Sequence, residues 1–545
     1  MPSHSSRNGH FKKIPLGIQD FKSLLKDGYL YIDKTALAYR LVSNGRYYFL
    51  SRPRRFGKSL FVSTLKAYFS GKKELFKDFA LYTLEKERKQ HPILHLDLNT
   101  GKYETPQALD EVLNEHLTAW ENLYGKNPAE IGLGRRFQGV IRRAAEQSGE
   151  RTVILVDEYD KPLLQAIGSP ALQDEFRNTL KSFYSALKSM DAYIRFAFLT
   201  GVTKFGKVSV FSDLNHLTDI SMDTRYYNLR GITEEELHQA LSPYVSRFAQ
   251  AQQMSLDDTF AMLRKRYNGY RFQKGLECVY NPYSLLSTFD KCEFGSYWFE
   301  TGTPTYLIEW MKNADMNLEN MSSAETDDKV LSGIDFNAPS PSPIPVIYQS
   351  GYLTFKGYDK EFDLYKLGFP NEEVEEGFFR FLLPYYTSIN EVDSPFQISQ
   401  FVREIRAGKA EDLIKRLKSF FADTPYELIK DLENHYQNVI FIISKLAGLY
   451  VKAEYHTSQG RIDLVLQTKP YTYVMEFKLD GSAEDALQQI KDRTYTLPFD
   501  TQGTRVIRIG LNFSKTTRNI DKWVIEENVQ INTSTFFLKA EHWIF

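Results

Sequence analysis

The chain has 545 residues, which is long for a single hydrophobic core and predicts several domains. Its formal net charge is −1, so a nucleic acid would have to bind a local basic patch rather than a uniformly basic surface. Two cysteines, Cys278 and Cys292, are too few for a disulfide framework or a cysteine-based zinc site. No apolar run is long enough to cross a bilayer, and residues 1–14 form a polar tail without the apolar core of a signal peptide. We therefore predict a cytoplasmic protein with no membrane partner.

Residues 15–230 alternate strand-like and helix-like segments. Four short apolar runs, "RYYFL", "PILHLDL", "TVILVDEY" and "YIRFAFLTG", are bounded by polar turns and separated by helix-like stretches. Strands that alternate with helices in this way predict a parallel sheet covered by helices. This part of the chain is therefore predicted to be an α/β domain.

The first apolar run is followed by Gly57-Lys58-Ser59 at the start of a helix-like stretch, as in a phosphate-binding loop. In such a loop the lysine reaches the terminal phosphates, the serine hydroxyl holds Mg²⁺, and the glycine lets the backbone approach closely. Arg52, however, stands where the first glycine of the full pattern is expected. This departure bears on the shape of the loop more than on phosphate binding itself.

Three arginines of the loop, Arg52, Arg54 and Arg55, have two interpretations. They either place positive charge directly on the phosphates in place of glycine amides, or form a solvated basic loop; fixed cations beside a triphosphate favour the first. The predicted nucleotide-binding residues of the loop are Arg54, Arg55, Phe56, Gly57, Lys58, Ser59 and Leu60.

A second motif, "TVILVDEYDKPLL", places Asp157 and Glu158 at the end of a predicted buried strand. An acidic pair there suits an ATPase, in which Asp157 would orient Mg²⁺ and Glu158 would polarise the attacking water. A solvated acidic turn is the alternative, but Lys58 earlier in the chain favours the ATPase. At the end of the next strand, Thr203 or Thr200 is a candidate to contact the γ-phosphate, with a purely structural threonine as the alternative.

From residue 231 the pattern changes to helices. Thr233 and Glu236 have the spacing of a capping box, and residues 231–340 are predicted to form a helical lid region. Residues 341–425 contain a helix end and a hairpin and are predicted to form a winged-helix-like unit with linker helices. The remaining residues, 426–545, are predicted to form a separate α/β domain.

The segment "GRIDLVLQTKPYTYVMEFKL" predicts two strands joined by a turn at Lys469-Pro470. Folding the hairpin there places Asp463 opposite or nearly opposite Glu476, about 4.5–5.5 Å apart between Cβ atoms. Lys478 shares a face with Glu476 because side chains two apart on a strand point the same way. Two carboxylates that close repel each other unless a cation lies between them, and oxygen ligands favour Mg²⁺ or Mn²⁺. The pattern therefore predicts a metal-dependent nuclease site in which Lys478 orients water or stabilises negative charge.

Two helices beside this hairpin supply further candidates. Glu433, on the helix upstream, is either another metal ligand or a solvated helix charge, whereas Gln489, on the helix downstream, is placed to reach the site. The alternative for Asp463, Glu476 and Lys478 is an ion-pair network on a solvated sheet face. An acid inside the apolar run "YVMEFKL" favours the functional interpretation.

These motifs belong to a longer series: "IPLGIQDF", "YIDKT", "SRPRRFGKSL", "ILVDEYDKPLL", "LTGVTKFGKVSVFSDLNHLTDIS", "YNGYRF", "VYNPYSLL", "YQSGYLT", "LGFPNEEV" and "GRIDLVLQ…YVMEFKLD…AEDALQQIKDRTY". In this order, over nearly the whole chain, they resemble a bacterial family that joins an AAA-ATPase-like domain to a C-terminal PD-(D/E)XK nuclease domain. The resemblance implies a P-loop ATPase core with an AAA-like parallel sheet, and a restriction-endonuclease-like α/β domain at the C-terminal end. It also implies that Arg52 is no departure, because "RPRRFGKS" is typical of this family.

The resemblance further implies roles for single residues. ATP binding would use Lys58 and Ser59, with Asp157 and Glu158 as the acidic pair. The nuclease metal ligands would be Asp463 and Glu476, Lys478 would be catalytic, and Gln489 would support them. One departure is Ile462, which stands where a proline is expected before the first nuclease acid.

Our leading hypothesis is an ATP-regulated, Mg²⁺-dependent nuclease whose partner is nucleic acid, DNA favoured over RNA, with defence against mobile DNA as a role. Nucleotide state would move the helical and winged-helix-like parts and gate access to Asp463 and Glu476. The alternative is a nucleotide-dependent switch whose C-terminal domain binds nucleic acid or a partner without cutting, and a third hypothesis is a protein-remodelling ATPase. The expected cofactors are ATP and Mg²⁺, with Mn²⁺ as an alternative at the nuclease site.

Overall fold

The chain folds into two compact units. They comprise residues 1–314 with 322–375, and residues 315–321 with 376–545. The computed structural model describes residues 11–204, 216–275, 277–300, 318–321, 324–331, 342–387, 389–390, 393–422, 432–448, 450–452, 455–457, 460–468, 470–500 and 505–527. No helix within these stretches has the length and apolarity needed to cross a membrane.

A five-stranded parallel sheet forms the centre of the first unit, with the strand order β2-β3-β4-β1-β5. Its strands are β1 (Tyr47–Ser51), β2 (Ile93–Asp97), β3 (Thr152–Asp157), β4 (Ile194–Gly201) and β5 (Thr218–Asp219). The first four are the predicted apolar runs, and β3 is buried along its whole length because helices cover it on both sides. The parallel sheet predicted from the sequence is therefore confirmed.

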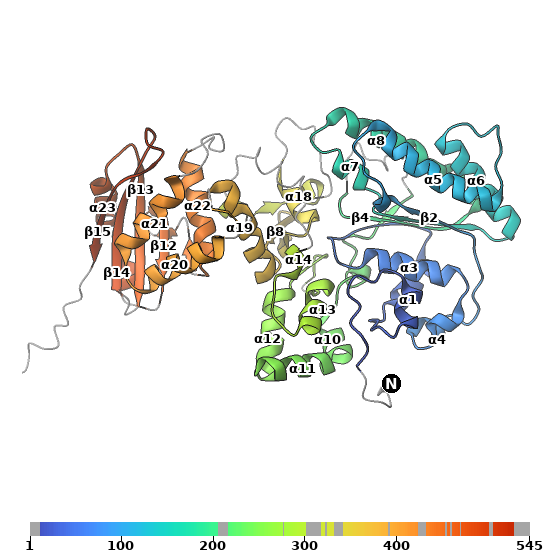
Figure 1. The fold of residues 1–545 in the computed structure, drawn as a ribbon, viewed down its shortest axis with the longest axis horizontal. Helices are drawn as coiled ribbons and strands as arrows, with labels where there is room; N and C mark the ends of the chain where they lie inside the picture. The colour runs from blue at the N-terminus through green and yellow to red at the C-terminus, as the bar shows by residue number, and fades with distance from the viewer. Residues whose placement is uncertain are drawn as a thin grey trace, which may run out of the picture. The chain divides into compact units, whose positions relative to one another are not determined.

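Helices lie on both faces of this sheet (Figure 1). One face carries α1 (Phe21–Lys26), α3 (Lys58–Phe69) and α4 (Ala80–Leu84), and the other carries α5 (Pro106–Tyr124), α6 (Leu133–Ser148) and α8 (Pro170–Tyr184). The remaining helices of this part are α2 (Thr35–Asn44), α7 (Lys161–Gln165) and α9 (Ala186–Ser189). Because the strands are parallel, their carboxyl ends share one edge of the sheet, and the loops after β1, β3 and β4 meet there.

The region after residue 231 is helical, as predicted. The predicted capping box is present: the Thr233 side chain accepts a hydrogen bond from the Glu236 amide, and the Glu236 carboxylate accepts one from the Thr233 amide. The helices are α10 (Glu234–Ala240), α11 (Ser242–Gln252), α12 (Leu256–Tyr267), α13 (Pro282–Lys291) and α14 (Tyr297–Glu300).

The predicted hairpin in the middle of the chain is also found. It pairs β7 (Thr354–Asp359) with β8 (Leu364–Gly368) in antiparallel register and follows α18 (Ile344–Gln349). A two-residue strand, β6 (Glu325–Thr326), completes a three-stranded sheet, and α17 (Asp328–Leu331) follows it. The hairpin belongs to the first unit.

The second unit is built on another five-stranded sheet, with the order β15-β14-β13-β12-β9. Only β13 and β14 run parallel; the other neighbours are antiparallel. The strands are β9 (Tyr450–Lys452), β12 (Leu464–Gln467), β13 (Tyr471–Leu479), β14 (Arg505–Ser514) and β15 (Asn519–Glu527), and a separate small pair is β10 (Tyr455–Thr457) with β11 (Gly460–Ile462).

Helix α23 (Ala483–Asp492) packs against β13 and β14 of this sheet. The other helices of the second unit are α16 (Leu318–Met321), α20 (Ser394–Arg406), α21 (Ala410–Ala422), α22 (Leu432–Leu446) and α24 (Leu497–Asp500). Helix α19 (Glu372–Tyr386) contributes residues to both units. The predicted order of helix, hairpin, helix and strand is found here, with β9 and β15 as additional edge strands.

A buried carboxylate ties the helical part of the first unit to the start of α19. Glu373 is completely buried, and its Oε1 accepts hydrogen bonds from the Trp298 amide on α14 and the Ser284 hydroxyl on α13, both at 2.9 Å. Burial raises the pKa of this carboxyl from the ordinary 4.5 to about 7, although the two hydrogen bonds act in the opposite direction.

The raised pKa of Glu373 predicts a pH-dependent stability. Between about pH 4.5 and about pH 7 the folded chain keeps a proton on Glu373 that the unfolded chain has lost, so the free energy of unfolding should fall as the pH rises through this window and level off above it. Glu373→Gln removes the titration. Urea unfolding should therefore show wild type losing stability relative to the variant, by at most about 1.4 kcal/mol per pH unit.

Glu361→Gln, in the exposed turn between β7 and β8, is the matched control and should keep the pH profile of wild type. Parallel profiles for wild type and Glu373→Gln would show that Glu373 does not titrate with a raised pKa.

Candidate functional site

The loop between β1 and α3 has the backbone of a phosphate-binding loop. Helix α3 begins at Lys58, so its first amides have no acceptor within the helix and are free to bind an anion. Gly57, just before it, has the left-handed φ of 77°. A Cβ at this position would lie 2.2 Å from an Arg230 guanidinium nitrogen, so only glycine fits.

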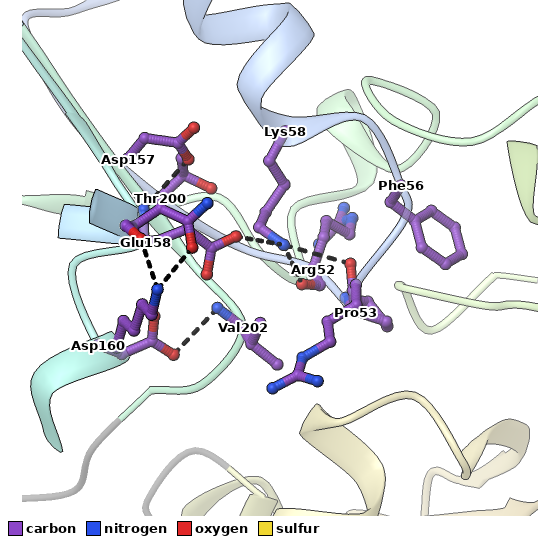
Figure 2. A network of polar contacts seen from close by, with 12 residues as sticks. Arg52, Pro53, Phe56, Lys58, Asp157, Glu158, Asp160, Thr200 and Val202 are labelled. Carbon is purple, nitrogen blue, oxygen red and sulfur yellow. Dashed lines mark hydrogen bonds and ion pairs between the residues drawn. The ribbon is translucent and has the colours of Figure 1, made fainter. Parts of the chain in front are cut away.

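Lys58 is buried inside this loop and bound to oxygen atoms on two sides. Its ammonium donates hydrogen bonds to the carbonyls of Arg52 at 3.1 Å and Pro53 at 3.3 Å, and lies 3.6 Å from the Glu158 carboxylate. Figure 2 shows the lysine side chain running from α3 toward these groups. The residue predicted to bind phosphate and the residue predicted to activate water are therefore in contact.

The acidic pair lies where β3 ends. Asp157 is only 4% exposed, and burial raises the pKa of its carboxyl to about 6, while a hydrogen bond with the Ser59 side chain acts in the opposite direction. Glu158 has a φ of 52°, which costs a residue with a side chain about 1 kcal/mol or more and turns the chain sharply at this point. The structure thus brings Ser59 and Asp157 together, as the two predicted Mg²⁺-binding residues require.

A cavity of about 760 Å³ opens on this loop. Its polar lining includes Arg54, Arg55, Gly57, Lys58, Ser59 and Glu158, together with Leu60 of the loop. Its apolar lining includes residues from two distant parts of the chain: Leu16, Ile18, Pro282, Tyr283 and Leu286. The guanidinium of Arg55 lies over the Tyr283 ring at 5.0 Å, which joins the polar and apolar parts. A cavity with one cationic part and one apolar part suits a nucleotide.

Two loop residues lie away from this cavity. Arg52 is almost completely buried and donates hydrogen bonds to the carbonyls of Ser51 at 2.9 Å and Ser221 at 2.6 Å, with its guanidinium 4.0 Å from the centre of the Phe272 ring. The interpretation of Arg52 as a phosphate-binding cation is therefore wrong; it anchors the loop to β5 and the helical region. Phe56, also predicted to bind nucleotide, has its ring buried against Tyr270 and Phe272 instead.

The threonines predicted to sense the γ-phosphate are used elsewhere. The Thr203 hydroxyl donates to the buried Asp160 carboxylate at 2.7 Å, and the Thr200 hydroxyl donates to the Leu50 carbonyl at 2.8 Å. Both threonines are completely buried, and neither lines the cavity. Asp160 also accepts the amides of Val202 and Thr203, so these groups hold the ends of β3 and β4 together (Figure 2). The structure does not bring Thr203 to the site.

Two cations that line the cavity, Arg230 and Lys161, were not predicted. Arg230 lines the cavity, and its Nε donates to the Phe56 carbonyl at 3.1 Å. Burial lowers the pKa of its guanidinium to about 10. Arg230 is far from the loop in sequence, in "YYNLRGI", where no spacing pattern relates it to Lys58.

The second candidate site lies in the hairpin of the second unit. Register between β12 and β13 pairs Leu464 with Met475, which places Asp463 opposite Glu476, as predicted. One Asp463 carboxylate oxygen accepts a hydrogen bond from the Phe477 amide at 2.7 Å, so the aspartate is held against the strand that carries Glu476. The turn falls at the predicted place, because Gln467 pairs with Thr472.

Gln489 joins the two other predicted residues. Its amide nitrogen donates to Oε1 of Glu476, and its amide oxygen accepts from the Lys478 ammonium. Its position follows from α23, which buries Ala483, Leu487 and Ile490 against the sheet and so turns Gln489 toward β13. The structure therefore brings Asp463, Glu476, Lys478 and Gln489 into one cluster.

The electrostatics of this cluster fit a cation. Glu476 is 3% exposed. Its burial is the main cause, and repulsion from Asp463 the next, of the rise in the pKa of its carboxyl to about 8. Its Oε2 is buried without a hydrogen-bond partner among the residues that the structure describes, and an orphaned carboxylate oxygen is a suitable ligand for a hard cation. The backbone of Glu433 lies in α22, but its side chain is outside the described part of the chain. Among described side chains, no cluster of three metal-ligating residues forms.

Comparison with known proteins finds a family match over each of the two regions that contain these sites. Residues 15–211 match a family model described as "Predicted AAA-ATPase", and residues 431–523 match one described as "PD-(D/E)XK nuclease superfamily". A relative from Azotobacter chroococcum mcd 1, described as "Uncharacterized protein in vnfD 5'region", is 36% identical over 526 residues, which cover 94% of this chain and 99% of that protein. With the parallel sheet and loop of the first unit and the paired acids of the second, these matches show that the chain belongs to the family of AAA-ATPase-like proteins with a C-terminal PD-(D/E)XK nuclease domain.

Proposed function

We propose that this protein is an ATP-dependent nuclease that hydrolyses phosphodiester bonds of nucleic acid, with DNA as the favoured substrate and Mg²⁺ as the metal. The observation that carries the proposal is the cluster of Asp463, Glu476, Lys478 and Gln489 around the buried Glu476, one of whose carboxylate oxygens has no hydrogen-bond partner among the described residues. A nucleotide-dependent switch without nuclease activity would need no such arrangement, because burying one carboxylate next to a second one is costly.

In the first unit, Lys58 would exchange its loop carbonyls for the terminal phosphates of ATP, and the free amides at the start of α3 would bind the same phosphates. Arg54, Arg55 and Arg230 add positive charge at the cavity. Ser59 and Asp157 would hold Mg²⁺. Glu158, whose contact with Lys58 weakens when phosphate takes the lysine, is then available to orient and deprotonate the attacking water.

In the second unit, Asp463 and Glu476 would hold the divalent cation. The bound cation polarises the scissile phosphate and lowers the pKa of water. Lys478 would stabilise negative charge on the phosphate or orient the water. Gln489 keeps Lys478 and Glu476 in place because it is hydrogen-bonded to both.

Lys58→Ala should weaken ATP binding at least about tenfold, because it removes a charged group from hydrogen bonds with phosphate oxygens. The measurement is the Kd of ATP by calorimetry on the purified full chain. Lys66→Ala, on the exposed side of the same helix, is the matched control and should bind ATP like wild type. Equal affinity in Lys58→Ala and wild type would remove this loop from the proposed function.

Glu476→Ala should reduce cleavage about 100-fold or more, because the metal loses one of its two carboxylates, and should leave ATP hydrolysis in place. The assay uses linear and circular DNA, single-stranded DNA and RNA, with Mg²⁺, Mn²⁺ or EDTA, and with or without ATP. Glu484→Ala, an exposed acid on α23, is the control and should cut like wild type.

The same assay separates the proposal from its alternatives. Cleavage that survives in Glu476→Ala would place the nuclease elsewhere, and cleavage of RNA alone would overturn the choice of DNA. A wild-type chain that binds ATP but cuts no substrate in any buffer would favour the nucleotide-dependent switch.

A further inference from the structure

An indole is one of the groups that hold the nucleotide loop from outside the ATPase sheet. The Trp298 Nε1 donates a hydrogen bond to the backbone carbonyl of Arg54 at 3.1 Å. Trp298 is 5% exposed, and its ring packs edge-on against Tyr352 at a centroid distance of 5.0 Å. Because Arg54 and Arg55 both line the cavity, the carbonyl held by Trp298 lies in the stretch of backbone that presents their side chains.

Trp298 is in turn held by Glu373. The Glu373 carboxylate accepts the Trp298 amide and the Ser284 hydroxyl on the same oxygen, each at 2.9 Å. Ser284 lies on α13, whose first residues, Pro282 and Tyr283, line the cavity. One completely buried carboxylate therefore binds both the segment that contacts the loop and the helix that forms part of the cavity.

Close packing on the same side of the loop leaves little freedom. Gly351, in the turn before β7, has a φ of 94°, and a Cβ there would lie 2.6 Å from a Pro53 side-chain carbon and 3.5 Å from the Trp298 ring. The backbone at Gly351 is therefore packed closely against Pro53 of the loop and lies beside the Trp298 ring, which leaves little room for either to shift.

We propose that Trp298 and Glu373 are positioning residues for nucleotide binding: Glu373 fixes Trp298, and the Trp298 indole fixes the loop so that Arg54 and Arg55 face the cavity. This inference rests on the proposed ATP site. It also gives α19 a role, since this helix starts at Glu372 in the first unit, carries Glu373 in its first turn and continues through residues 376–386 of the second. The helix that holds the loop is therefore part of both units.

Trp298→Phe tests the first step, because it removes the indole N–H and keeps an aromatic ring in the packing. The loss of one hydrogen bond of ordinary strength should raise the KM for ATP roughly fivefold, with a smaller effect on kcat. Tryptophan emission should change when ATP binds to wild type, and this change should disappear in Trp298→Phe. Trp120→Phe, on α5 and stacked on Phe137, is the matched control and should keep both the KM and the emission change.

Substitutions at Glu373 test the second step. Glu373→Ala leaves the Trp298 amide and the Ser284 hydroxyl without their acceptor and should raise the KM for ATP to a similar extent. Glu373→Gln retains an acceptor oxygen and should therefore have a KM close to that of wild type. Because Glu373 acts through Trp298, the double variant Trp298→Phe/Glu373→Ala should be no worse than the more affected single variant.

Thermal unfolding curves first establish that Trp298→Phe and Glu373→Ala are folded. The proposal is overturned if these folded variants keep the wild-type KM and emission change. Fully additive effects in the double variant would equally contradict it. Either result differs from failure of the proposed function, in which wild type itself would not bind ATP.

Discussion

A buried ammonium group determines the shape of the nucleotide loop. Lys58 is 5% exposed, and a charge removed from water to this extent has to be surrounded by oxygen atoms. The loop supplies them by turning two carbonyls, those of Arg52 and Pro53, toward the lysine, while β3 supplies Glu158. The path of residues 52–57, the left-handed backbone at Gly57 and the sharp turn at Glu158 all serve this one contact. Under the proposed function the phosphates of a nucleotide would offer the same lysine stronger acceptors, so the loop would hold in advance the geometry that binding requires.

The buried charge also explains why this loop departs from the usual glycine pattern. The position of the first glycine is occupied by Arg52, whose side chain turns away from the cavity and bonds to the carbonyls of Ser51 and Ser221. Its guanidinium on the Phe272 ring and the Trp298 indole on the Arg54 carbonyl hold the outside of the loop, while Lys58 holds the inside. A loop anchored on both sides does not need the flexibility that a glycine at position 52, in addition to Gly57, would give.

Features with a local pattern were predictable from the sequence. The four apolar runs gave the parallel sheet, and the hairpin turn gave the pairing of Asp463 with Glu476, because strand register follows from the turn. Gln489 was predictable for a similar reason, as helical periodicity places it beside a buried face. Contacts between distant segments carry no such pattern. Arg230 reaches the loop from the far end of the domain, and Thr203 is bonded to Asp160, which directly precedes α7 in a different part of the chain.

The two sites differ in how their charges are balanced before a ligand binds. In the first unit, Lys58 lies near Glu158, and Asp157 interacts with Ser59, so opposite charges and hydroxyl groups already compensate one another. In the second unit, Lys478 is bonded to the neutral Gln489, and burial together with repulsion from Asp463 raises the pKa of Glu476 to about 8. A cation bound between the two carboxylates would relieve this repulsion. Under the proposed function the hairpin site would use a metal for its charge balance, whereas the loop would exchange one set of oxygen atoms for another, which is the property that a nucleotide-controlled element needs.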